Sequence, residues 1–77
     1  MKAYVMIKIR PGEITEAIRQ MRDVSGVVEA NMTFGPYDAV AYVEGKDLQA
    51  IGRIVAANIQ AAPGVLETLT CLVIDNI

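Results

Sequence analysis

The sequence predicts an α+β fold, in which a four-stranded antiparallel sheet carries two helices on one of its faces. The first indication is periodicity: segments with apolar residues at every second position alternate with segments in which they recur every three or four positions. The second is an internal repeat, because an offset of 38 positions places Ala3-Tyr4-Val5 on Ala41-Tyr42-Val43 and Gly26-Val27 on Gly64-Val65. We therefore expect a single domain, residues 1–77, made of two similar units in the order βαββαβ.

The first half is predicted to form a strand over residues 3–9, a helix, and a second strand over residues 27–34. Apolar residues alternate with Tyr4 and Lys8 in the first strand, which ends at Pro11-Gly12. The helix ends at Ser25-Gly26, since glycine adopts the left-handed conformation of a helix C-terminus without steric cost. Its inner face carries apolar residues at helical spacing: Ile14, Ala17, Ile18, Met21 and Val24.

The second half repeats this order. A turn of four residues, Gly35-Pro36-Tyr37-Asp38, leads into a strand over residues 39–43, so these two strands form an antiparallel hairpin. Asp47 is expected to cap the second helix, which Pro63-Gly64 ends, and the last strand covers residues 65–74. The inner stripe of this helix is Leu48, Ile51, Val55, Ile59 and Ala62.

Right-handed connections place both predicted helices on the same face of the sheet, which is the ferredoxin-like arrangement. Four apolar side chains occupy strand positions that point to the other, uncovered face, and we predict that they form a dimer interface. These residues are Tyr4, Met6, Val40 and Tyr42. A second stripe on the second helix either reflects the helix propensity of alanine or marks a further oligomer contact. It consists of Ala50, Ile54, Ala57 and Ala61.

Composition also favours an oligomer. Apolar residues make up 53% of the chain, and a domain of this size has little interior in which to bury them. One cysteine and no histidine argue against a disulfide framework and against most metal sites, and no cofactor is expected. Association with a second subunit is the remaining source of stability.

Charge and hydropathy exclude two classes of partner. The net charge is −2 and the seven Lys and Arg residues are scattered, so direct binding to nucleic acid is not expected. No apolar run reaches about 18 residues, and the N-terminus lacks the pattern of a signal peptide, so no membrane partner is expected. These observations favour a cytoplasmic location.

No catalytic constellation is visible. Cys71 has no histidine to activate it and is expected to be a buried thiol of the last strand. Glu29 and Glu67, which occupy equivalent positions of the two halves, are expected to be solvated residues at the rim of the sheet. The sequence therefore predicts a protein that is not an enzyme.

The hairpin turn is the candidate ligand site. The carboxylate of Asp38 is suited to an ammonium group, and backbone N–H groups of the turn are suited to a carboxylate, so the two ends of an amino acid match this segment. Gly, Pro and Asp are equally typical of an ordinary turn, and both interpretations stay open at this point.

Three motifs resemble those of the C-terminal effector-binding domain of the Lrp/AsnC family, also called the RAM domain. They are Ser25-Gly26-Val27-Val28-Glu29-Ala30, Phe34-Gly35-Pro36-Tyr37-Asp38-Ala39-Val40 and Pro63-Gly64-Val65-Leu66-Glu67-Thr68. The resemblance implies dimers made through the sheets, rings of such dimers, and a small effector, usually an amino acid, bound between dimers near the hairpin. Carried over to this sequence, it implies a ligand site at Gly35, Tyr37 and Asp38, where Pro36 removes one backbone donor.

Members of the family normally begin with a helix-turn-helix domain, which this sequence does not show. We therefore expect a stand-alone effector-binding domain that acts as a sensor or assembles with a full-length Lrp/AsnC-type regulator. Two other interpretations remain. The ACT domain has the same element order, and Arg10-Pro11-Gly12 is similar to its first strand-to-helix loop. A small dimeric α/β-barrel enzyme also pairs its sheets.

Overall fold

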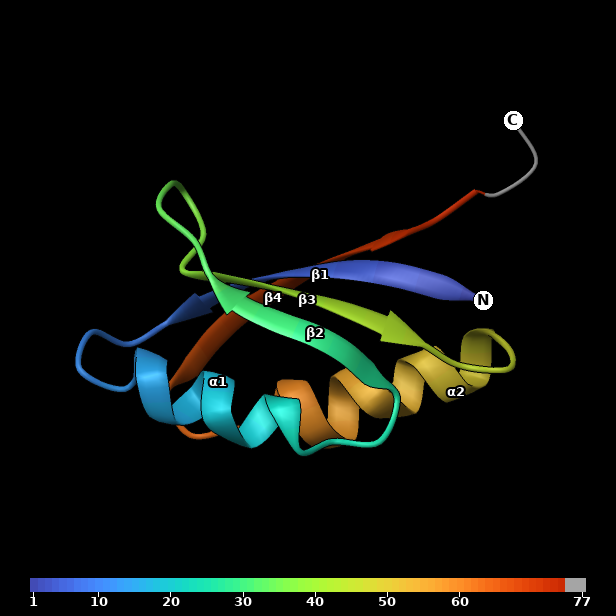
Figure 1. Ribbon diagram of the computed structural model, residues 1–77, viewed down its shortest axis with the longest axis horizontal. Helices are drawn as coiled ribbons and strands as arrows, with labels where there is room; N and C mark the ends of the chain where they lie inside the picture. The colour runs from blue at the N-terminus through green and yellow to red at the C-terminus, as the bar shows by residue number, and fades with distance from the viewer. Residues whose placement is uncertain (75–77) are drawn as a thin grey trace.

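The computed structural model describes residues 1–74 and has the predicted element order (Figure 1). A single sheet lies over one layer of helices, so the α+β sandwich with both helices on one face is confirmed. The elements are β1 (Lys2–Ile9), α1 (Ile14–Arg22), β2 (Val27–Met32), β3 (Ala39–Glu44), α2 (Leu48–Arg53), η1 (Ile54–Ile59) and β4 (Val65–Leu72).

The sheet has the strand order β2-β3-β1-β4, and every neighbouring pair is antiparallel. The two central strands, β1 and β3, are the first strands of the two sequence repeats. Tyr4 is the register partner of Tyr42, its equivalent in the other repeat, and Ala3 and Val5 pair crosswise with Val43 and Ala41 on either side of them. β2 and β4 are the two edges.

The core lies between the sheet and the helices. Alternate residues of β1 and β3 point into it, and the residues between them point to the other face. Burial of an Ile or Val side chain contributes about 1.5–3 kcal/mol, and this layer supplies most of the apolar burial in the domain. The largest fully buried side chains are Ile7, Met21, Ile51, Ile59, Val5 and Val43.

Local capping signals in the sequence correspond to the observed helix boundaries. The Oδ1 atom of Asp47 accepts the backbone N–H of Ala50 at 2.8 Å, which confirms the predicted N-cap of α2. Gly26 and Gly64 precede β2 and β4 with φ angles of +96° and +82°, where a side chain is strained.

The second helix differs from the prediction in its second half. α2 continues into the π-helical segment η1, in which the N–H of Gln60 donates to the carbonyl of Val55 at 2.7 Å. Ile54, predicted on an outer stripe, packs against the core instead. The reason is that Ile54 lies only about 60° around the helix axis from Ile51, near enough to reach the core beside Gly26.

Leu48 was predicted on the inner stripe of the second helix but is 58% exposed. The first turn of α2 borders a groove of about 400 Å³ between this helix and β4, and the groove leaves Leu48 accessible. Leu72 and Thr70 line the opposite side of this groove. In residues 1–74 no helix is long and apolar enough to cross a membrane.

Three further predictions need correction. β2 ends at Met32 and not at residue 34, so the hairpin loop has six residues, 33–38, and not four. β4 ends at Leu72 and not at residue 74. Cys71, predicted to be buried, is exposed, because it lies on an edge strand opposite Tyr4 and faces away from the helices.

Candidate ligand-binding site

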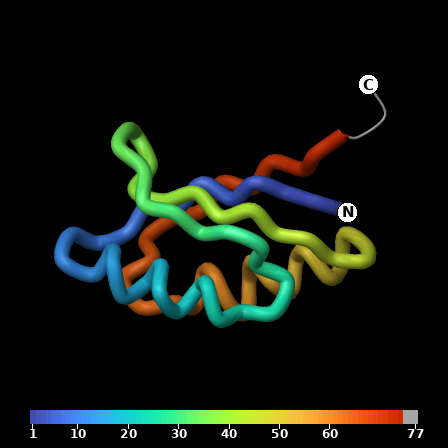
Figure 2. The backbone as a smooth tube through the Cα atoms, in the orientation of Figure 1, coloured from blue at the N-terminus to red at the C-terminus, as the bar shows by residue number. Residues whose placement is uncertain are grey.

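The hairpin between β2 and β3 projects from the sheet, away from the helices (Figures 1 and 2). The N–H of Thr33 donates to the carbonyl of Asp38 at 3.0 Å, and the Thr33 hydroxyl donates to the carbonyl of Tyr37 at 2.8 Å. These two bonds close the loop at its base, so the shape of the hairpin is set by its own residues.

Asp38 joins this hairpin to β1. Its backbone N–H donates to the carbonyl of Ile7 at 2.9 Å, and its Oδ2 atom accepts the backbone N–H of Ile9 at 2.8 Å. The side chain thus adds one more bond to the β1–β3 ladder and is itself held in place. Oδ1 has no hydrogen bond to any residue in the described range 1–74, which leaves an acceptor oriented by the fold.

The tip of the hairpin is open. Phe34 is fully exposed, and Pro36 offers no backbone donor. Gly35 has no positive φ, and a methyl group placed on its Cα meets no atom of residues 1–74 within 4 Å. Neither the backbone conformation nor packing within the chain requires a glycine at this position.

Tyr37 brings a basic residue to the site that the sequence analysis did not assign to it. The ammonium nitrogen of Lys8 lies 5.7 Å from the centroid of the Tyr37 ring. The proximity follows from the pairing of β1 with β3. Because Ile7 lies opposite Ala39, Lys8 lies opposite Asp38, the residue next to Tyr37. The sequence alone does not give this register, so Lys8 could not be assigned to the site before the strand pairing was known.

The four residues predicted for a dimer interface share the uncovered face of the sheet. The Tyr4 and Tyr42 rings lie 4.8 Å apart between centroids, and Val40 is the register partner of Met6. On β4, Leu69 and Cys71 lie opposite Met6 and Tyr4. We call these six residues the open-face patch: Tyr4, Met6, Val40, Tyr42, Leu69 and Cys71. Its role in dimerisation stays a prediction.

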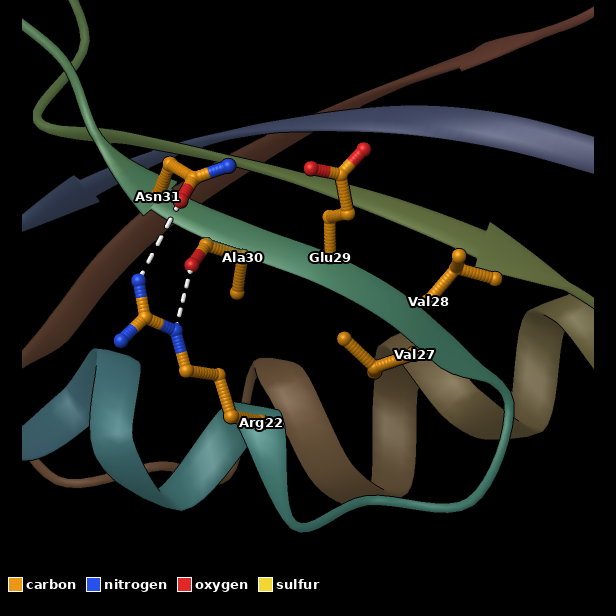
Figure 3. A pocket seen from close by; sticks show the side chains of 6 residues that line it. All are labelled: Arg22, Val27, Val28, Glu29, Ala30 and Asn31. Carbon is orange, nitrogen blue, oxygen red and sulfur yellow. Dashed lines mark hydrogen bonds between the residues drawn. The ribbon is translucent and has the colours of Figure 1, made fainter.

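Among the surface hollows in the described part of the chain, three lie away from the hairpin, and none of these three is lined by a hairpin residue. One is the α2–β4 groove, and another lies between α1 and Met32. The third follows the edge of β2, where the Nε of Arg22 donates to the carbonyl of Ala30 at 2.7 Å and its Nη2 donates to the Asn31 side chain at 3.2 Å (Figure 3). Glu29 lines the same hollow but points to the other face of the sheet from Arg22 (Figure 3).

Comparison with known proteins defines the class of this domain: it is a ligand-binding domain of the kind found in transcription regulators. More specifically, the chain belongs to the Lrp/AsnC ligand-binding domain family, whose model matches residues 2–77. The resemblance seen in the sequence motifs is confirmed. So is the prediction that the domain is not an enzyme, because the family is regulatory.

Two relatives share the sequence over most of this chain. The HTH-type transcriptional regulator Ptr1 of Methanocaldococcus jannaschii is 30% identical over 57 residues, which are 74% of this chain and 38% of Ptr1. The homocitrate synthase of Sulfurisphaera tokodaii is 35% identical over 76 residues, which are 97% of this chain and 16% of the enzyme. The chain therefore spans well under half of either relative.

Solved structures share the fold along the whole domain. The protein TTHA0845 from Thermus thermophilus matches with a TM-score of 0.92 and 29% identity, over 99% of this chain and 95% of that protein. The transcriptional regulator NMB0573 of Neisseria meningitidis, solved as a complex with L-Met, matches with a TM-score of 0.85 and 19% identity. That match covers 99% of this chain and 51% of the regulator chain.

Proposed function

We propose that this domain binds a small-molecule effector, an amino acid or a related metabolite, and that it does so as an oligomer with the hairpin at the binding site. In this proposal Gly35, Tyr37 and Asp38 contact the effector. The domain acts as a sensor or as an assembly partner of a full-length Lrp/AsnC-type regulator, in the cytoplasm and without direct contact to DNA.

The observation that carries the proposal is the hydrogen bonding of the Asp38 carboxylate. One of its oxygens is fixed by the N–H of Ile9, while the other has no hydrogen-bond partner in residues 1–74. A carboxylate oxygen held in this way is suited to the ammonium group of an amino acid. A structural analogy also supports an amino-acid effector, since NMB0573 has the same fold and was solved with L-Met.

The open-face patch supports assembly through the sheets. Tyr4 is 48% exposed and Leu69 is 47% exposed, although both lie well inside their strands. In a two-fold dimer, the open-face patch of each subunit covers the same patch of the other, so both are removed from water. The dimer predicted from the sequence therefore remains our proposal for this face.

The hairpin supports a site that is completed by another subunit. It projects from the sheet, and none of the three hollows described above includes it. Most ligand sites bury the greater part of their ligand, which an isolated projecting loop does not do. We propose that position 35 is a glycine because the effector or a neighbouring dimer approaches the backbone closely there.

A thermal-shift panel with the twenty L-amino acids tests the proposal, after sedimentation has established that the protein is assembled. An effector present at 100 times its Kd stabilises the folded state by about 2.7 kcal/mol. For a domain of this size, the Tm then rises by about 10 °C or more. Absence of any saturable shift in assembled protein, both for the amino acids and for their keto-acid and amine derivatives, contradicts the proposal.

A second candidate concerns the partner. The match to 16% of a homocitrate synthase favours a role beside a biosynthetic enzyme, because nearly the whole chain aligns with that segment. Mixing the purified domain with a full-length Lrp/AsnC-type regulator, and separately with a homocitrate synthase from the same organism, distinguishes the two partners. Co-elution from a sizing column with only one of them identifies it, and co-elution with neither contradicts both partner roles.

A further inference from the structure

Lys8 lies between two carboxylates on the uncovered face of the sheet. The register of β1 and β3 pairs Ile7 with Ala39, so the next position brings Lys8 opposite Asp38. On its other side, Lys8 is the register partner of Glu67 in β4. Cross-strand neighbours on one face have Cβ atoms about 4.5–5.5 Å apart, so the Lys8 side chain leaves the sheet between the positions of Asp38 and Glu67.

The Lys8 ammonium group is paired with neither carboxylate. Within residues 1–74, no nitrogen–oxygen distance of 4.0 Å or less joins Lys8 to Asp38 or Glu67. The ammonium lies instead over the Tyr37 ring, and Asp38 directs Oδ2 to the N–H of Ile9. The base of the hairpin therefore carries one positive charge and one carboxylate oxygen that has no hydrogen bond within residues 1–74.

We propose that Lys8 binds the carboxylate of the effector, while Oδ1 of Asp38 accepts its ammonium group. This inference rests on the proposed function and narrows it to ligands that carry both charges on one carbon, namely free α-amino acids. In such a ligand the two charged groups are adjacent, so their protein partners must be adjacent as well, and cross-strand neighbours meet this condition.

The sequence of the turn explains why a side chain, and not the backbone, would bind the carboxylate of the effector. An anion at a turn is commonly held by successive backbone N–H groups. Pro36 has no N–H, so the turn of this chain lacks one such donor at the centre of its loop. Lys8 supplies the positive charge from the neighbouring strand, and the Tyr37 ring keeps its ammonium group at the hairpin.

The experiment compares variants by calorimetric titration of the assembled protein. Lys8→Met removes the charge and keeps the length of the side chain, Lys8→Arg keeps the charge, and Lys46→Met is the matched control at an exposed lysine in the β3–α2 loop. The probes are the twenty L-amino acids and, for each one that binds, its α-amide, which lacks the carboxylate charge. Circular dichroism and sedimentation show that each variant is folded and assembled.

We expect the unaltered protein and Lys46→Met to bind the acid at least 10-fold more tightly than the amide. We expect Lys8→Met to bind the acid about 10-fold or more weakly than the unaltered protein and to show no preference for the acid over the amide. Lys8→Arg should retain most of the affinity and most of the preference. If a folded and assembled Lys8→Met binds the acid as tightly as the unaltered protein, or keeps the same acid-to-amide ratio, Lys8 has no such role and the proposed function still stands. If the unaltered protein binds none of the amino acids, the role of Lys8 is overturned, and the proposed function is overturned as well when the keto-acid and amine derivatives also fail to bind.

Discussion

The backbone N–H of Ile9 donates to the Oδ2 atom of Asp38 at 2.8 Å, although the two residues are 29 positions apart in the chain. The bond ties the hairpin to the end of β1, which is the strand that also carries Lys8. Asp38 therefore has a structural contact in addition to the ligand contact proposed for it. A test of ligand binding at Asp38 has to separate these two contributions.

Asp38→Asn is the variant that separates them. The amide oxygen still accepts the Ile9 N–H, so we expect stability within about 0.5 kcal/mol of the unaltered protein, while loss of the negative charge weakens amino-acid binding at least 10-fold. Asp38→Ala removes both contacts and lowers the free energy of unfolding by about 1–2 kcal/mol as well. Urea unfolding and calorimetric titration measure the two effects. Unchanged amino-acid affinity in Asp38→Asn removes Asp38 from the site.

Alanine substitution is expected to lower the free energy of unfolding by a different amount at each of three glycines. At Gly26, alanine combines a φ of +96° with a Cβ placed 2.5 Å from Cδ1 of Ile54, so we expect a loss of about 2–3 kcal/mol. Gly12 has a φ of +90° and free space, which leaves only backbone strain of about 1 kcal/mol. Gly35→Ala is expected to leave stability unchanged within about 0.5 kcal/mol.

The same series tests the proposed site. If the effector or a neighbouring dimer approaches Gly35, then Gly35→Ala weakens effector binding even though its unfolding curve is that of the unaltered protein. Gly12→Ala, whose side chain lies away from the hairpin, serves as the control for binding. Equal affinity in Gly35→Ala and Gly12→Ala means that nothing approaches Gly35 closely.

Tyr42→Glu is expected to dissociate the proposed dimer. It places a carboxylate in the open-face patch, where the facing subunit has no established partner for it, and burial of such a charge is unfavourable. Tyr42 is only half-buried in the single chain, so the monomer should stay folded. Val28→Glu is the matched control, because Val28 is an exposed apolar residue at the β2 edge. Sedimentation should give a smaller species for Tyr42→Glu alone, and identical species for both variants count against this interface.

Arg22 protects the edge of β2. Arg22→Ala removes the donors to the Ala30 carbonyl and to the Asn31 side chain, and we expect a loss of about 1–2 kcal/mol in the free energy of unfolding. It also frees a carbonyl on an edge strand, which favours pairing with other chains. Arg19→Ala is the control, because within residues 1–74 Arg19 pairs only with the exposed Glu16. The denaturation midpoint and the tendency to aggregate should change more for Arg22→Ala than for Arg19→Ala.

Part of the candidate site was predictable from the sequence and part was not. Gly35, Tyr37 and Asp38 lie in one motif, so their proximity follows from the chain itself. Lys8 joins them only through the pairing of β1 with β3, and the motif contains no information about that register. The fixed orientation of Asp38 likewise depends on Ile9, which belongs to another strand.

The sequence by itself determined the order of the elements, the capping role of Asp47, the bends at Gly26 and Gly64, and the common face of Tyr4 and Tyr42. These features depend on residue periodicity and on local backbone preferences, which act within a few residues of chain. Only the tertiary structure decided which apolar residues are covered. Cys71 and Leu48 are exposed and Ile54 packs against the core, because burial depends on the elements that lie above a side chain, and an edge strand such as β4 has fewer of them.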